Sequence, residues 1–189
     1  NSMRQYIHKL SNTVIMSPTD TWKLSDVNIK PQRGWQAAAG LYLNSPSGIW
    51  EYSVEGYYKR MSDYLDYRGG AKLLMNHHIE TDVINTEGHA YGVELQVKKQ
   101  VGKLNGWMSY TYSRTFLRQN DKRIEKPVNN GDWYPTEYDK PHDFKFVGNY
   151  KFTHRYSMSI NVDYSTGRPT TIPAGQYYDE STQSMRVYY

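Results

Sequence analysis

The sequence predicts an all-β protein: an antiparallel up-and-down transmembrane β-barrel, here a partial barrel of about eight strand segments. Three observations lead to this prediction. Apolar and polar residues alternate along most of the chain with a period of two, as in strands with two different faces. Short and long connections alternate, so all the short ones fall at one end of the sheet. Aromatic residues gather near both strand ends, with aliphatic residues between them.

The composition excludes several other classes of protein. The 189 residues include no cysteine, and the net charge is +4 with a pI of about 9.0. The mean hydropathy of −0.85 is low, and no run approaches the ~20 apolar residues of a membrane-spanning helix. A barrel tolerates this polarity because only alternate strand residues meet lipid. Lysine and arginine are scattered, with no cluster longer than Lys98–Lys99, so we expect no nucleic-acid partner.

The clearest segment is a predicted hairpin over Asp143–Ser165. A pairing of Phe152 with Tyr156 across a three-residue loop keeps all its large apolar side chains on one face. That face carries Phe144, Phe146, Gly148, Tyr150, Phe152, Tyr156, Met158, Ile160, Val162 and Tyr164. The residues between them are mostly polar, so one face is aromatic and aliphatic and the other is expected to face water.

The first part of the chain is less regular. Met3–Leu10 alternates poorly but is expected to form a strand, and Ser11–Gly34 is expected to form a long ordered loop. Alternation then predicts a strand over Trp35–Leu43 and another over Trp50–Met61. Between them, Ser45–Gly48 has proline and glycine where a tight turn prefers them.

The second half repeats this arrangement. A long polar connection over Asp63–His89 precedes strands at Tyr91–Lys98 and Gly106–Ser113. Val101–Leu104 predicts a two-residue hairpin turn, with Gly102 at the position that needs a positive φ. Two further long loops, Thr115–Pro141 and Thr166–Ser184, flank the hairpin described above. Met185–Tyr189 is predicted to begin another strand.

The strand ends predict two aromatic belts around an apolar band. Near the short turns lie Trp50, Tyr150, Phe152 and Tyr156. Near the long loops lie Tyr58, Tyr91, Tyr112, Phe144 and Tyr164. Between them lie Val54, Val93, Leu95, Ile160 and Val162. A bilayer selects this pattern. The alternative is a soluble antiparallel sandwich that buries the same face, although its core would use more leucine and phenylalanine than tyrosine.

Several stretches, taken in order, resemble the barrel of TonB-dependent outer-membrane receptors, and the resemblance covers nearly the whole chain. They are Asn28–Gln32, Ala90–Leu95, Leu104–Ser113, Tyr138–Phe144 and Tyr164–Pro169. The resemblance implies a barrel of about 22 strands, closed by an N-terminal plug. It places residues 1–189 within the C-terminal half of that one domain, as a fragment without the plug, the TonB-contacting box or a second domain. The short stretch Ser184–Tyr189 is expected to be a truncated strand.

The function that this resemblance implies is uptake through the outer membrane of a Gram-negative cell. Long outer loops would capture a scarce, bulky solute, and TonB would act on the plug. The implied partners are outer-membrane lipid, the plug and TonB, and no enzymatic activity or cofactor is expected. The solute stays open between an iron chelate, cobalamin, a glycan and a peptide, and so does a partner lipoprotein. Two alternatives also stay open: a small passive porin-like or adhesin-like barrel, and a soluble β-sandwich binding module.

The polar strand face would then line a hydrated lumen. It carries Glu51, Glu55, Glu94, Lys98, Lys145, Lys151, Asn161 and Asp163. Glu51 and Glu55 lie four residues apart on one strand face and resemble a catalytic carboxylate pair, but we interpret both as lumen residues.

The sequence predicts one candidate substrate-binding pair and no catalytic, metal or cofactor site. Trp133 and Tyr134 stand in the third long loop, where exposed aromatic rings stack on ligands. The same rings are equally able to fold the loop onto itself. The pair His77–His78 has no ligand partner at a metal-site spacing, and Asp132, Glu137 and Asp139 match no calcium loop.

Overall fold

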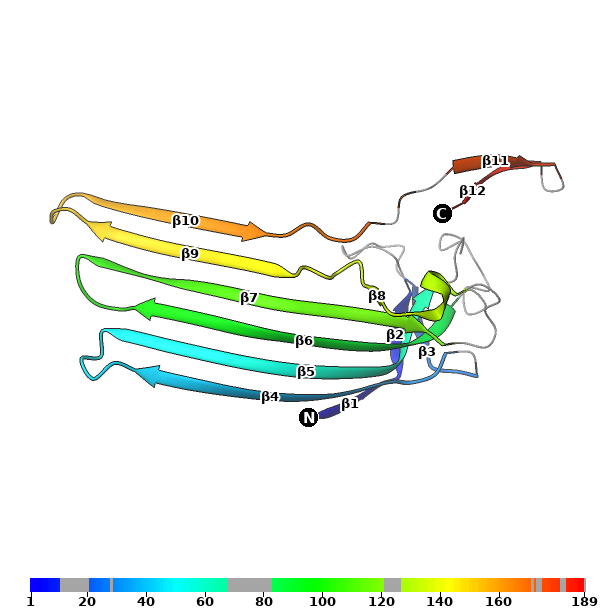
Figure 1. Cartoon of the computed structure of the whole chain (residues 1–189), viewed down its shortest axis with the longest axis horizontal. Coiled ribbons are helices and arrows are strands. Elements are labelled where there is room, and N and C mark those ends of the chain that lie inside the picture. Colours follow the sequence, from blue (N-terminus) through cyan, green and yellow to red (C-terminus); the bar gives the residue numbers. More distant parts are fainter. Residues whose placement is uncertain are drawn as a thin grey trace.

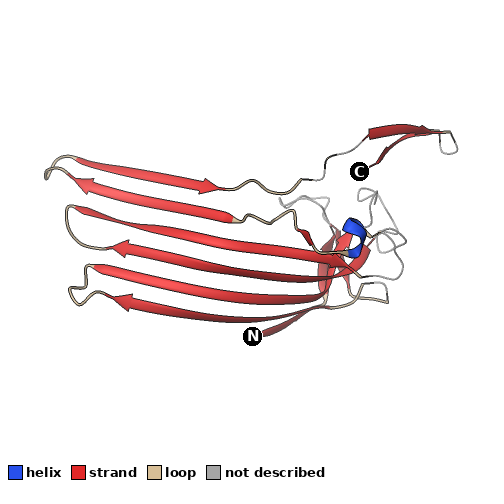
Figure 2. Cartoon of the chain, viewed as in Figure 1, coloured by secondary structure: helices blue, strands red, loops and turns tan. Residues whose placement is uncertain are grey.

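The computed structural model of the chain describes residues 1–10, 21–27, 29–67, 83–120, 127–170, 172, 175–180 and 183–188. These residues form almost only strands (Figures 1 and 2). In chain order they are β1 Ser2–Gln5, β2 Ile7–Leu10, β3 Thr21–Leu24, β4 Gln32–Asn44, β5 Trp50–Tyr67, β6 Val83–Lys99, β7 Leu104–Gln119, the 3₁₀ turn η2 Val128–Gly131, β8 Tyr134–Pro135, β9 His142–Lys151, β10 Ser157–Ser165, β11 Gly175–Asp179 and β12 Ser184–Tyr188. No helix in this described part is long and apolar enough to cross a membrane.

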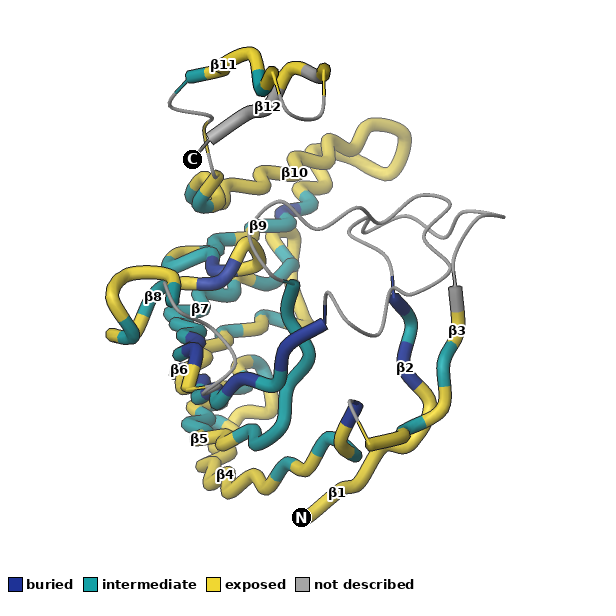
Figure 3. The backbone as a smooth tube through the Cα atoms, turned by 90° about the vertical axis from the view of Figure 1, so that its right-hand side faces the viewer, coloured by how far each residue is buried: buried dark blue, intermediate teal, exposed yellow. Residues whose placement is uncertain are grey.

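The main sheet is a single antiparallel layer. Its strand order is β1-β4-β5-β6-β7-β9-β10, and the short β8 pairs with the far end of β7. Viewed along the strands, β4 to β10 follow one another around an open arc (Figure 3). The short turns between β4 and β5, β6 and β7, and β9 and β10 lie at one end of the sheet, and the strand ends that lead into the long connections lie at the other (Figure 1). This arrangement confirms the prediction of an all-β, antiparallel up-and-down sheet, which does not close into a barrel within the described residues.

The strand register confirms the predicted alternation. One continuous cross-strand row runs through Leu41, Val54, Leu95, Tyr110, Phe144 and Tyr164. The neighbouring row runs through Tyr42, Ser53, Gln96, Ser109, Lys145 and Asp163. Successive rows point to opposite faces because side chains alternate along a strand. We call the two sides of the sheet the apolar face and the polar face.

The short turns form where the sequence predicts them. The Gly48 N–H donates to Ser45 O at 2.8 Å, and Gly48 has a φ of 66°. Gly102 has a φ of 111°, the left-handed region that the predicted hairpin turn requires. In the third turn the Phe152 N–H donates to Tyr156 O at 3.0 Å, which confirms the predicted pairing.

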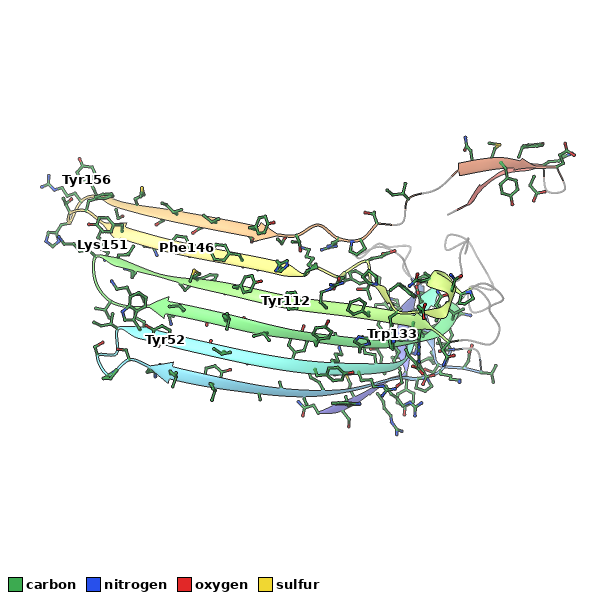
Figure 4. The ribbon with its side chains drawn as sticks, viewed as in Figure 1. Tyr52, Tyr112, Trp133, Phe146, Lys151 and Tyr156 are labelled. Carbon is green, nitrogen blue, oxygen red and sulfur yellow. The ribbon has the colours of Figure 1, made fainter. Side chains whose placement is uncertain are left out.

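The apolar face has no covering layer among the described residues. Its aliphatic side chains remain accessible: Val54 is 45% exposed and Leu95 is 41% exposed. Aromatic pairs mark both borders of this band. Tyr150 packs on Phe152 at a ring-centroid distance of 4.7 Å near the short turns, and Trp35 packs on Tyr58 at 5.6 Å near the long connections. Figure 4 labels Tyr52, Phe146 and Tyr156, which belong to this face. A soluble sandwich would bury these side chains.

Buried side chains concentrate at the long-connection end instead. Leu10, Ile29 and Val83 form a small cluster against which Leu65 and Tyr67 pack. The first two come from the N-terminal segment, where β2 pairs with β3. The predicted long loop over Ser11–Gly34 is therefore wrong in part, because β3 and the first residues of β4 lie within it. The expected single strand Met3–Leu10 is divided into β1 and β2.

The strands at this end are longer than predicted. The expected connection Asp63–His89 contains the end of β5 and the first residues of β6, and β7 continues past Ser113 to Gln119. The ladder continues across an irregularity between Met61 and Tyr64. The sequence predicts that these strands end where apolar and polar residues stop alternating. In the structure, the backbone hydrogen-bond pairing of the strands continues beyond that point.

The C-terminal prediction also needs correction. Met185–Tyr189 was expected to begin a barrel strand, but β12 pairs with β11 in a separate two-stranded sheet. The expected loop Thr166–Ser184 therefore contains β11. The main sheet nonetheless has eight strands among the described residues, because the unpredicted β8 pairs with the far end of β7.

Candidate functional site

The candidate site lies where strands β5, β6 and β7 extend beyond the apolar band. We call residues 61–67, 83–90 and 114–119 the strand extensions. The connection between β7 and β9 folds back onto them, because Tyr134–Pro135 pairs with Phe116–Leu117. The Thr136 N–H also donates to Thr115 O at 3.1 Å. This return of the chain places both predicted aromatic residues against the strand extensions.

Trp133 packs on the side of the strand extensions that continues the apolar face. Its ring meets the edge of the His89 ring at a centroid distance of 4.3 Å and an interplanar angle of 72°. The Arg118 guanidinium carbon lies 4.9 Å from the centroid of the same ring, a cation–π arrangement. The Asn129 side-chain amide donates to Trp133 O at 3.1 Å. Trp133, labelled in Figure 4, lies at the long-connection end of the sheet. It keeps 38% of its surface exposed, so one side of the residue is anchored and the other is accessible.

Tyr134 packs on the opposite side. Its hydroxyl donates to Asp66 Oδ2 at 2.6 Å, a bond that joins the β7–β9 connection to the end of β5. Burial, reinforced by the Asp66 carboxylate, raises the pKa of Tyr134 well above its usual value. The phenol therefore stays protonated and remains a donor to the carboxylate at physiological pH.

The two aromatic residues do not form one clamp. They are neighbours in an extended segment, so their side chains point to opposite faces. The contacts agree with this: His89 and Phe116 share a row on the apolar face, whereas Asp66 pairs with Ile84 on the polar face. Both rings hold the connection against the strands. A solute contact made by Trp133 and Tyr134 stays a prediction.

Asp139 provides a second anchor for the same connection. Its carboxylate is buried, with 2% side-chain exposure, and it accepts from Arg114 Nε at 3.0 Å and from the Thr115 N–H at 2.8 Å. The sequence suggested this residue only as an unspecific loop carboxylate. Its role depends on residues 24 and 25 positions away, and no local spacing indicates such a partner.

The polar face carries a network of side-chain bonds at the height of the apolar band. Tyr42 donates to Glu55 at 2.8 Å, and Lys98 lies 3.3 Å from Glu51. Gln100 also donates to Glu51. The two glutamates that resemble a catalytic pair therefore have separate partners. These bonds give both glutamates a lysine, glutamine or tyrosine partner, as suits a hydrated lining.

Among the described residues, no group of three or more histidine or acidic side chains is placed to hold a metal ion. His77–His78 lies outside the described residues. His142 Nδ1 pairs with the Tyr110 hydroxyl at 2.8 Å.

The residues that sequence reasoning missed are Asp66, Glu87, His89 and Arg118. All four lie in the strand extensions. Continued period-two spacing along β6 and β7 places Glu87, His89 and Arg118 on one strand face, whereas Asp66 follows an irregularity in β5 and no spacing indicates its partner.

The comparisons with known proteins agree with this architecture. The family model described as TonB dependent receptor-like, beta-barrel, matches residues 6–188. Searches of curated proteins and of solved structures gave no significant match. The family consists of outer-membrane receptors and transporters of Gram-negative bacteria, rather than enzymes. With a match over almost its whole length, the chain belongs to the TonB-dependent receptor family, as part of its β-barrel.

Proposed function

We propose that the chain forms part of the wall of an active importer, which takes up a scarce, bulky solute with energy supplied through TonB. The observation that carries this proposal is the one-layer sheet, with an exposed apolar face and long connections at one end only. Such a wall is stable where lipid covers the apolar face. Residues 1–189 would then belong to one barrel domain, with outer-membrane lipid, a plug and TonB as partners.

The polar face supports a hydrated passage. Two of its carboxylates, Glu51 and Glu55, are paired with lysine, glutamine or tyrosine groups, so they can face water or a polar plug without unpaired buried charge. We assign it no chemical step, cofactor or nucleic-acid contact. Its role would be to keep the passage open and hydrated while the solute moves through it.

The solute would be captured at the long-connection end, by the segment that contains Trp133 and Tyr134. Trp133 is anchored on His89 and Arg118 yet remains partly accessible, and a pre-positioned ring loses little entropy when a ligand stacks on it. Tyr134 borders the polar face, where the passage would begin. An iron chelate, cobalamin, a glycan and a peptide all present surfaces that aromatic rings contact.

Replacing Trp133 with alanine is expected to raise the half-saturation concentration for uptake about three- to tenfold, because one aromatic contact is lost. The measurement is accumulation of labelled candidates of these four classes by cells, with and without functional TonB. Tyr156→Ala is the matched control, since it removes an exposed aromatic ring from the short-turn end. Uptake that continues without TonB would contradict the importer and favour the passive barrel. Equal effects of the two variants would contradict the capture site.

A further inference from the structure

A single titratable ring lies at the centre of the contacts that hold Trp133. His89, in the part of β6 beyond the apolar band, stands directly opposite Phe116 of β7. Its ring stacks on that of Phe116 at a centroid distance of 5.4 Å and meets the ring of Trp133 at 4.3 Å. Tyr91 of β6 also stacks on it, at 6.3 Å. His89 therefore joins the strand extensions to the connection between β7 and β9.

Three arginines surround His89 on this side of the sheet. Arg60 of β5 stands directly opposite His89 in the ladder between β5 and β6. On β7, Arg114 and Arg118 cover two rings that contact His89, with guanidinium carbons 4.7 and 4.9 Å from the ring centroids. A proton on His89 would add a fourth positive charge to this group. Like charges at such distances disfavour the charged form of the histidine.

The nearest carboxylates do not offset this charge. Glu87, two residues before His89 on the same face of β6, is already paired with Arg118 at 2.8 Å. In the connection, Asp132 is exposed and has an extended backbone, so its side chain points away from the face that its neighbour Trp133 contacts. A protonated His89 would thus lie between cations and aromatic rings, without a carboxylate of its own among these neighbours.

The docked position of Trp133 therefore favours the neutral form of His89. Burial, and then the charge of Arg60, lowers the pKa of His89. When Trp133 leaves, the ring gains water and its pKa moves back toward the ordinary value of about 6.5. The released state then binds the proton more tightly than the docked state. Docking is therefore complete above about pH 6.5 and weakens as the pH falls below that value.

We propose that His89 is a pH-dependent latch, and that its protonation releases Trp133 and η2 from the strand extensions. The two move together because the Asn129 side-chain amide donates to Trp133 O at 3.1 Å. The release is confined to this segment, since the bonds of Tyr134 and Asp139 to the strands do not involve His89. The latch requires neither TonB nor a transported solute, so it and the importer fail separately.

The test is electron paramagnetic resonance of the intact receptor in phosphatidylcholine vesicles, with a nitroxide attached at neutral pH to Val128→Cys. Val128 lies in η2 and is 43% exposed, so the label reports the mobility of this segment. The mobile fraction is expected to be about three- to tenfold larger at about pH 5.5 than at about pH 7.5, because the released state holds almost a full proton at the lower pH. A mobile fraction that is equal at the two pH values would overturn the proposal.

Three variants of the labelled protein assign the response to one histidine. His89→Phe keeps an aromatic ring against Trp133 but does not titrate, so its mobile fraction is expected to change less than about twofold with pH. His89→Gln, which also lacks a titratable group, should show the same small change. His142→Gln is the matched control and should keep the full response, because His142 pairs with the Tyr110 hydroxyl instead. A full response in either His89 variant, or its loss in His142→Gln, would overturn the proposal.

Discussion

Replacing Ile160 with arginine is expected to make membrane insertion less favourable by about 2–4 kcal/mol. Ile160 lies on the apolar face of β10, opposite Gly148, and is 46% exposed in the wall. A guanidinium group there would lose its hydration at the depth of the acyl chains. The measurement is reversible denaturant unfolding of the intact receptor in phosphatidylcholine vesicles. Val93→Arg is expected to behave in the same way, since Val93 is 44% exposed on the same face.

The neighbouring residue provides the matched control. Ser159 lies on the same strand at nearly the same depth but on the polar face, where its hydroxyl bonds to Asn149 Oδ1 at 2.7 Å. Ser159→Arg places the same charge toward the aqueous side and is expected to cost less than about 1 kcal/mol. If Ile160→Arg and Ser159→Arg were tolerated equally, the assignment of lipid and lumen faces would be wrong.

Replacing Asp139 with alanine is expected to release the β7–β9 connection at a cost of about 2–4 kcal/mol, because the Thr115 N–H and the Arg114 side chain lose a buried acceptor. Hydrogen exchange of residues 127–141 measures this loss and should accelerate well beyond that of β5 and β6. Asp139→Asn keeps an oxygen for the Thr115 N–H and should have a smaller effect.

The pair between Arg118 and Glu87 provides the contrast for this prediction. Its side chains are 35% and 34% exposed, and such pairs contribute about 0–1 kcal/mol. Glu87→Ala is therefore expected to leave exchange in residues 127–141 nearly unchanged. An equal acceleration in Glu87→Ala and Asp139→Ala would show that burial of Asp139 does not hold the connection.

The wall itself was predictable from sequence because a bilayer imposes a two-residue period on every strand that crosses it. Val54, Leu95 and Tyr110 repeat that signal on the consecutive strands β5, β6 and β7, and Gly48 and Gly102 mark two of the short turns. Beyond the apolar band the constraint disappears. Strands β5 to β7 continue there as paired backbone with mixed side chains, so the sequence pattern ends before the strands do.

The candidate site was less predictable because its contacts are long-range. Trp133 and Tyr134 were recognisable as loop aromatics, but their partners Arg118 and Asp66 depend on how the connection returns to the edge of β7. The pairing of β12 with β11 is similar: a five-residue strand carries no information about its partner. Neither contact follows from periodicity, composition or local spacing.

Labelling of single introduced cysteines on intact cells tests the central claim most directly, and this chain contains no cysteine of its own to interfere. Tyr138→Cys replaces a residue of the β7–β9 connection that is 52% exposed, and His154→Cys lies in the exposed turn between β9 and β10. A membrane-impermeant maleimide should label position 138 on intact cells. It should label position 154 only after the outer membrane is permeabilised. Equal labelling of both positions on intact cells, or a reversed pattern, would contradict an outer-membrane wall with its long connections outside.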